Sequence, residues 1–200
     1  MDRTKYMNAD EARRLRTVCE ASAMIDAQKG RIRGQLAWAV VDLALQTGLR
    51  VSELARLTVG DANLKRRSLH VWRHKRRKPV QETIAISVDL AKHLKSFIAL
   101  KAAIQQSVEP GAPLFVGKRG PLTTQGLQQI WKRAIAEAGL PGELSIHSAR
   151  HTLAVHLLKK TGNLRIVQKQ LGHASPTITA NMYADVSFED MQTAVSDVYE

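Results

Sequence analysis

Six side chains whose types suit the cleavage of a phosphodiester bond are spread over four short motifs of this sequence. Arg50 lies in TGLRVSEL, and a lysine follows in the basic stretch RHKRRKPVQET. The motif HSAR holds a histidine and an arginine, and LGHASPTITANMYADV holds a histidine and a tyrosine. Attack on a phosphodiester places extra negative charge on the non-bridging oxygens of the phosphorus, so an enzyme must offset that charge with preorganised cations.

Two arginines, Arg50 and Arg150, are the cations that we expect to bind the phosphate. Guanidinium groups stay charged and bind phosphate oxygens in bidentate geometry. Two-metal sites, the other common solution, need clustered carboxylates, whereas the acids before the C-terminal segment are scattered. The single cysteine, Cys19, forms no zinc-binding pattern with the histidines. We therefore expect no metal and no other cofactor.

Tyr183 is the candidate nucleophile. A free tyrosine has a pKa of about 10, so it attacks poorly at neutral pH unless cations and hydrogen bonds favour the phenolate. Two arginines and the histidines His147 and His173 would supply them. The chain has three tyrosines, and the other two, Tyr6 and Tyr199, lie near the termini without cationic neighbours in sequence.

The elements that must position these residues are mostly helical. Asn8, followed three residues later by Glu11, is typical of a helix N-terminus. Gly48 suits the left-handed end of a second helix, directly before Arg50. SLHVW and TIAIS alternate apolar and polar residues on either side of the basic run, which predicts an antiparallel hairpin with that run at its tip. We expect helices at about 9–28, 31–48, 51–57, 88–106, 123–138, 148–160, 164–171 and 187–198.

Composition agrees with one globular domain that binds a polyanion. The 200 residues carry a formal net charge of +12, and 44% of them are hydrophobic. No apolar run is long enough to span a membrane, and the N-terminus lacks a signal peptide, so we expect a cytoplasmic protein with no membrane partner. The segment after Tyr183 is acidic and contains no lysine or arginine.

These motifs, in this order, resemble the catalytic domain of the tyrosine recombinases, also called phage integrases, and the resemblance covers the chain from about Tyr6 to the C-terminus. It implies a mainly α fold with a small antiparallel β-sheet (α+β). It also implies that His147 acts as an acid or base or binds the phosphate, that His173 donates to a phosphate oxygen, and that the acidic Glu53 orients Arg50. Ala149 departs from the leucine that is frequent in the family, which affects packing rather than charge.

The resemblance also implies a catalytic lysine in the hairpin turn, and two residues compete for this role. Counting forward from the first strand favours Lys75 at the strand end, and counting back from the second favours Lys78. We prefer Lys75, because Pro79 indicates that Lys78 lies in the irregular part of the turn. The remaining basic residues of this run are expected to contact DNA phosphates: Arg73, Arg76, Arg77 and Lys78.

The function that the resemblance implies is site-specific recombination of double-stranded DNA through a covalent 3′-phosphotyrosyl intermediate, without metal or ATP, by a bacterial or phage-encoded integrase of a mobile element. The family acts as a tetramer on DNA, and whether the free protein is a monomer stays open. We expect residues 1–200 to form one catalytic domain that begins after the family's N-terminal core-binding domain. We expect residues 184–200 to form an acidic helix whose apolar stripe docks either on a neighbouring protomer or on its own core.

Three alternatives remain at this point. A type IB topoisomerase uses the same chemistry to relax DNA, and only its products differ. A non-catalytic DNA-binding remnant of an integrase would bind DNA without covalent attachment, although the complete set of residues argues against a decayed site. A metal-free ribonuclease could use the histidines and the lysine, but it would leave Tyr183 without a purpose.

Overall fold

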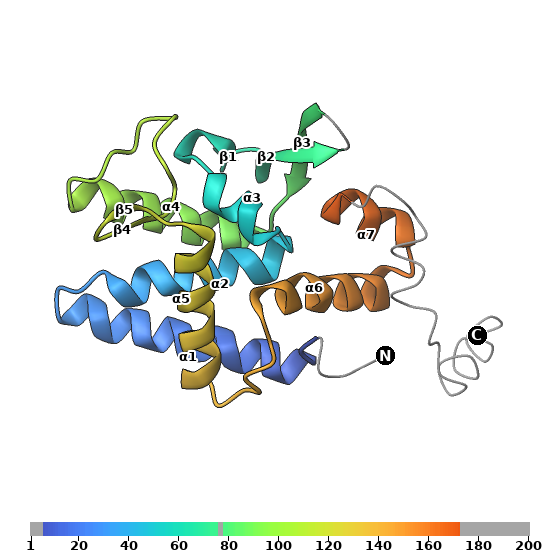
Figure 1. The fold of residues 1–200 in the computed structure, drawn as a ribbon, viewed down its shortest axis with the longest axis horizontal. Helices are drawn as coiled ribbons and strands as arrows, with labels where there is room; N and C mark the ends of the chain where they lie inside the picture. Colours follow the sequence, from blue (N-terminus) through green and yellow to red (C-terminus); the bar gives the residue numbers. More distant parts are fainter. Residues whose placement is uncertain (1–5, 76–77, 173–200) are drawn as a thin grey trace.

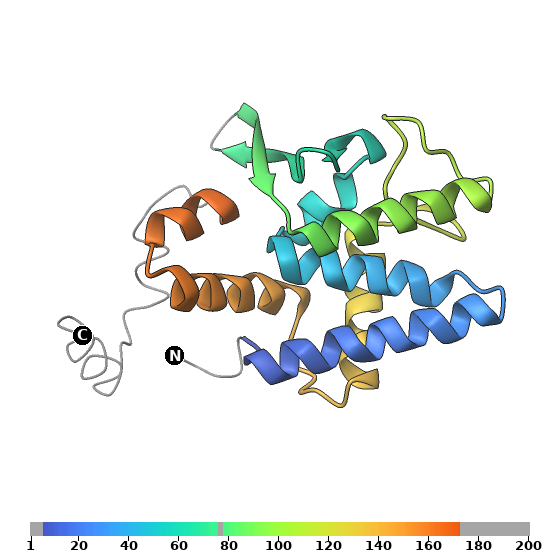
Figure 2. The same ribbon diagram turned by 180° about the vertical axis from the view of Figure 1, so that it is seen from behind.

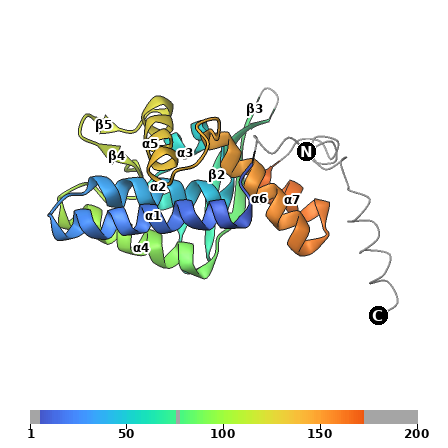
Figure 3. The ribbon, with the colours of Figure 1, turned by 90° about the horizontal axis from the view of Figure 1, so that it is seen from below.

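A computed structural model describes residues 6–75 and 78–172 of the chain, in which a group of packed helices carries a small three-stranded sheet at one side (Figure 1). Helix α1 (Ala9–Gln28) lies antiparallel to α2 (Arg33–Thr47). Helix α4 (Val88–Ala103) packs against α2, and α5 (Thr124–Glu137) crosses both α1 and α2. The views from behind and from below place α4 and α5 on opposite sides of this pair (Figures 2 and 3).

Local sequence signals set the helix ends as expected. Asn8 Oδ1 accepts from the backbone N–H of Glu11, and Glu11 Oε2 accepts from that of Asn8, both at 2.8 Å, so the predicted capping motif is present. Gly48 ends α2 in the left-handed conformation, with φ of 62°. The helices α3 (Val51–Arg56), α6 (Ile146–Thr161) and α7 (Leu164–Leu171) also lie within a few residues of their predicted positions.

The hairpin is longer than its sequence pattern indicated. Strands β2 (Ser68–Lys75) and β3 (Lys78–Ala85) pair antiparallel along their whole length, so most of the basic run belongs to the strands rather than to a loop. A short strand β1 (Ala62–Asn63), which the sequence analysis did not predict, pairs with β2 after a 3-10 turn at Val59–Asp61.

A second small sheet was also missed. It pairs β4 (Val116–Gly117) with β5 (Gly120–Pro121) across a turn at Lys118 and Arg119. Two-residue strands carry too little periodicity to be recognised from sequence.

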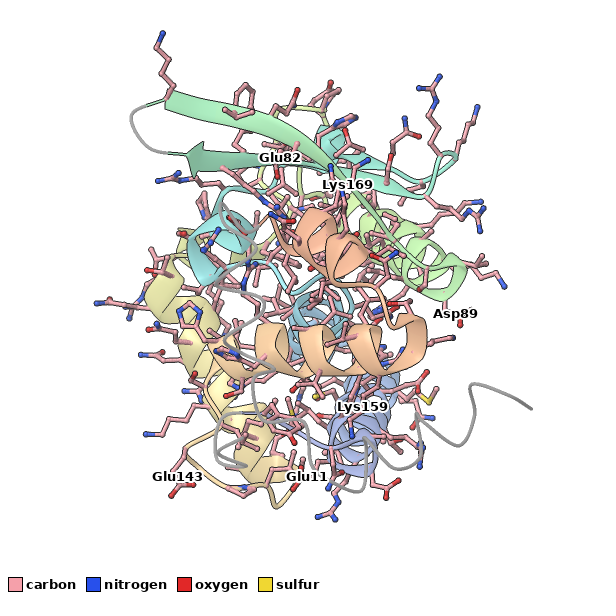
Figure 4. The ribbon with its side chains drawn as sticks, turned by 90° about the vertical axis from the view of Figure 1, so that its right-hand side faces the viewer. Glu11, Glu82, Asp89, Glu143, Lys159 and Lys169 are labelled. Atoms are coloured by element: carbon pink, nitrogen blue, oxygen red, sulfur yellow. The ribbon has the colours of Figure 1, made fainter. Side chains whose placement is uncertain are left out.

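The last two described helices, α6 and α7, lie beside the hairpin. Helix α6 packs against α2, and α7 packs against both α6 and β3. Figure 4 looks onto this region from the side and shows the hairpin, which carries Glu82, passing over α7, which carries Lys169. The start of α3, the start of α6, the end of α7 and the inner face of the hairpin therefore meet in one place.

The core between these layers is mainly aliphatic and contains the buried aromatic side chains Phe97, Phe115 and Trp131. Trp131 of α5 is buried, and its Nε1 donates to the Leu144 carbonyl at 2.8 Å, which satisfies the only polar atom of the indole. None of the helices in residues 6–75 and 78–172 is both long and apolar enough to cross a membrane.

A buried carboxylate, Asp42 of α2, joins three helices of this core. Its oxygens accept from Arg16 Nε of α1 at 2.9 Å, from Gln46 Nε2 at 2.8 Å and from His93 Nδ1 of α4 at 2.7 Å. Burial raises the pKa of Asp42, but the hydrogen bonds from His93 and Gln46 and the charge of Arg16 outweigh it, so the net pKa is lowered.

We expect Asp42→Asn to lower the free energy of unfolding at neutral pH by about 2–4 kcal/mol, because the donors around a 1% exposed site lose their anionic acceptor. A lowered folded-state pKa stabilises the fold above the unfolded value, and this contribution is lost as the pH falls through the folded value. The difference between the two proteins should therefore shrink below about pH 4. Urea unfolding from neutral to acidic pH measures it.

Glu143→Gln is the matched control, since it makes the same chemical change at an exposed carboxylate. Its unfolding free energy should stay within about 0.5 kcal/mol of the wild type. An equal loss in both variants, or a loss from Asp42→Asn that does not change with pH, would contradict this role for Asp42.

Candidate active site

Arg50 is held at the junction between α2 and α3. It is the N-cap residue of α3, two residues after the left-handed Gly48. Its backbone N–H donates to Glu53 Oε2 at 2.8 Å, and its Nη1 donates to Glu53 Oε1 at 2.9 Å. The Arg50 side chain is 43% exposed whereas that of Glu53 is 6% exposed, so a buried carboxylate orients a cation that remains open to a ligand. The contact expected between Glu53 and Arg50 is present.

Arg150 connects three segments that are distant in sequence. Its Nη1 donates to the Gly48 carbonyl at 2.8 Å, and its Nη2 donates to the Leu171 carbonyl at 2.7 Å. The Arg150 side chain reaches these carbonyls from the first turns of α6. Gly48 is the C-cap residue of α2 and Leu171 is the last residue of α7. Carbonyl groups at a helix C-terminus carry partial negative charge.

Electrostatics place the two arginines in one site. The pKa of Arg150 is lowered to about 10: burial is the largest cause, the charges of Arg50 and Arg73 also lower it, and Glu53 opposes them. The guanidinium therefore stays charged at neutral pH. Like charges held together in a partly buried site are stabilised by a bound anion, which is what phosphate recognition requires.

Arg73 is placed differently from our expectation. We predicted a phosphate contact at the hairpin tip, but the residue is 1% exposed on the inner face of β2. Its Nη1 donates to Glu82 Oε2 of β3 at 2.8 Å, and its Nη2 donates to the Gln170 carbonyl of α7 at 3.1 Å. A side chain enclosed in this way does not present its charge to DNA. The strand period contained the signal, because Leu69, Val71 and Arg73 alternate onto one face.

The two candidate lysines lie opposite each other. Lys75 ends β2, Lys78 begins β3, and they form the outermost described pair of the hairpin. The reason for preferring Lys75 was wrong, because Pro79 belongs to β3 and Lys78 is not in an irregular turn. Lys78 is exposed. Both residues remain candidates, and Arg76 and Arg77 lie outside the described residues.

The histidines and the tyrosine are only partly covered by the structure. His147 is exposed in the first turn of α6, one turn before Arg150. Gly172 ends α7 in the left-handed conformation, with φ of 66°. His173, Tyr183 and the acidic segment 184–200 lie outside the described residues. Over the described part of the chain, no three His, Cys, Asp or Glu side chains gather where they could hold a metal ion.

Curated relatives with this sequence pattern are recombinases. The tyrosine recombinase XerD of Oceanobacillus iheyensis is 36% identical over 166 residues, which cover 81% of this chain and 52% of that protein. The tyrosine recombinase XerC of Bacillus subtilis is 33% identical over 154 residues, covering 76% of this chain and 49% of the relative. The chain thus spans about half the length of these relatives.

Solved structures show the same fold. XerA recombinase superposes with a TM-score of 0.76 over 96% of this chain and 64% of its own, at 24% identity. The XerH site-specific recombinase bound to difH substrate superposes with a TM-score of 0.73 over 98% of this chain and 55% of its own, at 22% identity. The family model described as "Phage integrase family" matches residues 5–190. Because this match spans most of the sequence, the chain belongs to the phage integrase family.

Proposed function

We propose that the chain cleaves and rejoins DNA strands as a site-specific recombinase, through a covalent 3′-phosphotyrosyl link at Tyr183. The observation that carries the proposal is the convergence of Arg50 and Arg150, which lie far apart in sequence and share one site with the buried Glu53. A pair of fixed guanidinium groups is suited to the transition state of phosphoryl transfer, where charge accumulates on two non-bridging oxygens. The recombinase names of the relatives support the same activity.

Each group has a defined part in the proposed cleavage step. The Tyr183 oxygen attacks phosphorus, and the bond from phosphorus to the 5′ oxygen breaks. Arg50 and Arg150 bind the non-bridging oxygens, His173 donates to one of them, and His147 takes the tyrosine proton or binds the phosphate. The hairpin lysine, Lys75 or Lys78, gives a proton to the leaving 5′ oxygen.

Rejoining is the reverse of this step. The phosphotyrosyl bond keeps the energy of the broken phosphodiester, so a 5′-hydroxyl from the same or another duplex displaces Tyr183 without ATP. Attack by the original 5′-hydroxyl restores the first strand, and attack by a second one exchanges strands. The proposed reaction uses protein side chains alone to stabilise the charge, so no metal is required.

Duplex DNA is the proposed partner. The net charge of +12 favours a polyanion, and Arg76, Arg77 and Lys78 are proposed to contact its backbone. The XerH structure was solved with a DNA substrate, which supports this choice. We propose that four copies assemble on two duplexes, that segment 184–200 of each docks on a neighbouring copy, and that the protein works in the cytoplasm beside the DNA on which it acts.

Covalent capture tests the proposal. The wild type is incubated in EDTA with a pool of nicked duplexes that includes the DNA flanking its own gene, and complexes that resist denaturant are separated on a gel. We expect such complexes from the wild type and none from Tyr183→Phe, because the mutant lacks the attacking oxygen. Sequencing the trapped DNA identifies the site.

Tyr6→Phe is the control, since it removes the same hydroxyl from another tyrosine and should leave the yield unchanged. A complex that persists in Tyr183→Phe would assign the nucleophile to another residue. Salt-sensitive DNA binding without any complex would favour a non-catalytic DNA-binding module, and relaxed circles without exchanged strands would favour a topoisomerase.

A further inference from the structure

Arg73 is a buried cation that none of the proposed chemical steps uses. It is 1% exposed and joins three elements around the site. It pairs with Glu82 of β3 at 2.8 Å and with the Gln170 carbonyl of α7 at 3.1 Å, and its Nε lies 3.7 Å from Glu53 Oε1 of α3. The Nε makes no hydrogen bond within the described residues. Burying a guanidinium costs desolvation free energy, and an apolar side chain in its place would make none of these polar contacts.

The carboxylate next to Arg73 is the one that orients Arg50. Glu53 Oε1 accepts from Arg50 Nη1 at 2.9 Å and faces Arg73 Nε from the other side. Arg73 thus lies behind the pair that presents the first phosphate-binding arginine. The same side chain closes over the end of α7, because a Cβ built on Gly172 would overlap its guanidinium. One cation therefore contacts the hairpin, the partner of Arg50 and the residue that precedes His173.

The hairpin is attached to α7 at two described levels. At its base, the Gln170 side chain donates to the Ala85 carbonyl at 2.9 Å and accepts from the Ala85 N–H at 3.2 Å. Further out, Arg73 makes the second attachment through Glu82 and the Gln170 carbonyl. Beyond that level residues 78–81 are all exposed. Among the hairpin residues whose burial the structure describes, Arg73 is the outermost buried one, two residues before Lys75 and five before Lys78.

We infer that Arg73 is a positioning residue that holds the hairpin lysine in place relative to the phosphate bound by Arg50 and Arg150. It acts through Glu82 and the end of α7, and it touches neither the DNA nor the reacting atoms. This inference rests on the proposed function. It gives a specific expectation: loss of Arg73 impairs protonation of the leaving 5′ oxygen far more than phosphate binding, because Arg50 keeps its own two hydrogen bonds to Glu53.

Replacing the leaving 5′ oxygen with sulfur separates protonation of the leaving group from the other steps of the reaction. The trapped DNA site is made in two forms, with oxygen or with sulfur as the bridging 5′ atom at the scissile phosphate. A thiol has a pKa of about 8.5, so the thiolate leaves without receiving a proton, whereas an alkoxide needs one. Cleavage is followed in a single turnover at saturating DNA, which removes effects on DNA affinity.

We expect Arg73→Met to slow cleavage of the oxygen substrate by about a hundredfold, the size of a general-acid contribution, and cleavage of the sulfur substrate by less than about threefold. Arg73→Lys should cleave the oxygen substrate faster than Arg73→Met but more slowly than the wild type. Its ammonium group can pair with Glu82, but it lacks the second guanidinium nitrogen that donates to the Gln170 carbonyl. Glu82→Gln, which keeps the size of the side chain, should slow the oxygen substrate selectively as well. If Arg73→Met does not fold, Glu82→Gln tests the same positioning role.

Two control variants show whether the selective effect on the oxygen substrate is specific to Arg73. Arg50→Lys should slow both substrates equally, because it weakens phosphate binding rather than protonation. Arg66→Met removes an exposed arginine from the turn before β2 and should change neither rate. Equal slowing of both substrates by Arg73→Met, or unchanged rates in the folded variant, would overturn the positioning role alone. A wild type that cleaves neither substrate would overturn the proposed function and this inference with it.

Discussion

Arg150→Lys is expected to reduce the single-turnover rate of covalent complex formation by about a hundredfold to a thousandfold, the usual effect of removing one preorganised donor to a transition-state oxyanion. Arg150 uses two of its N–H groups on the Gly48 and Leu171 carbonyls. A lysine has the charge but not the planar fork, so it cannot keep both carbonyl bonds and bind a phosphate oxygen at once. The loss should appear with the oxygen and the sulfur substrate alike.

Arg13→Lys is the matched control, because it makes the same exchange in an exposed ion pair with Asp10 on α1. Its cleavage rate should equal that of the wild type. Circular dichroism and the urea midpoint show whether Arg150→Lys remains folded, since the carbonyl bonds also hold α6 to α2 and α7. A folded Arg150→Lys protein with a wild-type rate would remove Arg150 from the proposed mechanism.

Gly172→Ala is expected to lower the free energy of unfolding by about 3 kcal/mol and to abolish most of the cleavage activity. The residue has φ of +66°, where a side chain costs about 1–2 kcal/mol. The added methyl group would also overlap the guanidinium of Arg73, which cannot move away cheaply because it is buried and paired with Glu82. Displacing it disturbs the hairpin and the chain that leads into His173.

Gly162→Ala isolates the backbone contribution. Gly162 ends α6 with φ of +61°, and apart from its chain neighbours no atom of the described residues lies within 4 Å of the position of an added Cβ. Its loss of stability should be about 1–2 kcal/mol, and its cleavage rate should be unchanged. Urea unfolding and covalent capture of both variants give the comparison. Equal destabilisation by the two substitutions would show that Arg73 yields freely at the end of α7.

Features set by short-range spacing were predicted correctly from the sequence. Asn8 and Glu11 close a capping box because they are three residues apart at a helix start. The glycine at 48 ends α2 because a left-handed residue costs it no steric strain. The contact of Glu53 with Arg50 follows from the same spacing of three residues. These interactions are completed within one helical turn, so neighbouring residues are sufficient to specify them.

Short-range sequence patterns did not decide between Lys75 and Lys78. Pro79 was taken to mark an irregular turn, because proline lacks the N–H that a central strand needs. The structure places it in β3 opposite His74, within a hairpin that continues to Lys78. A proline is tolerated at such an edge, and only the register between the strands shows how far the hairpin extends.

By itself, the sequence determined the helix ends, the hairpin, the family and the set of residues proposed for the chemistry. Tertiary structure alone decided that Arg150 is anchored on carbonyls 102 and 21 residues away, and that Arg73 is an internal cation rather than a DNA contact. The physical reason is range. Caps and turns depend on neighbours within a few residues, whereas the burial of a charge depends on which distant segments surround it and provide its partners.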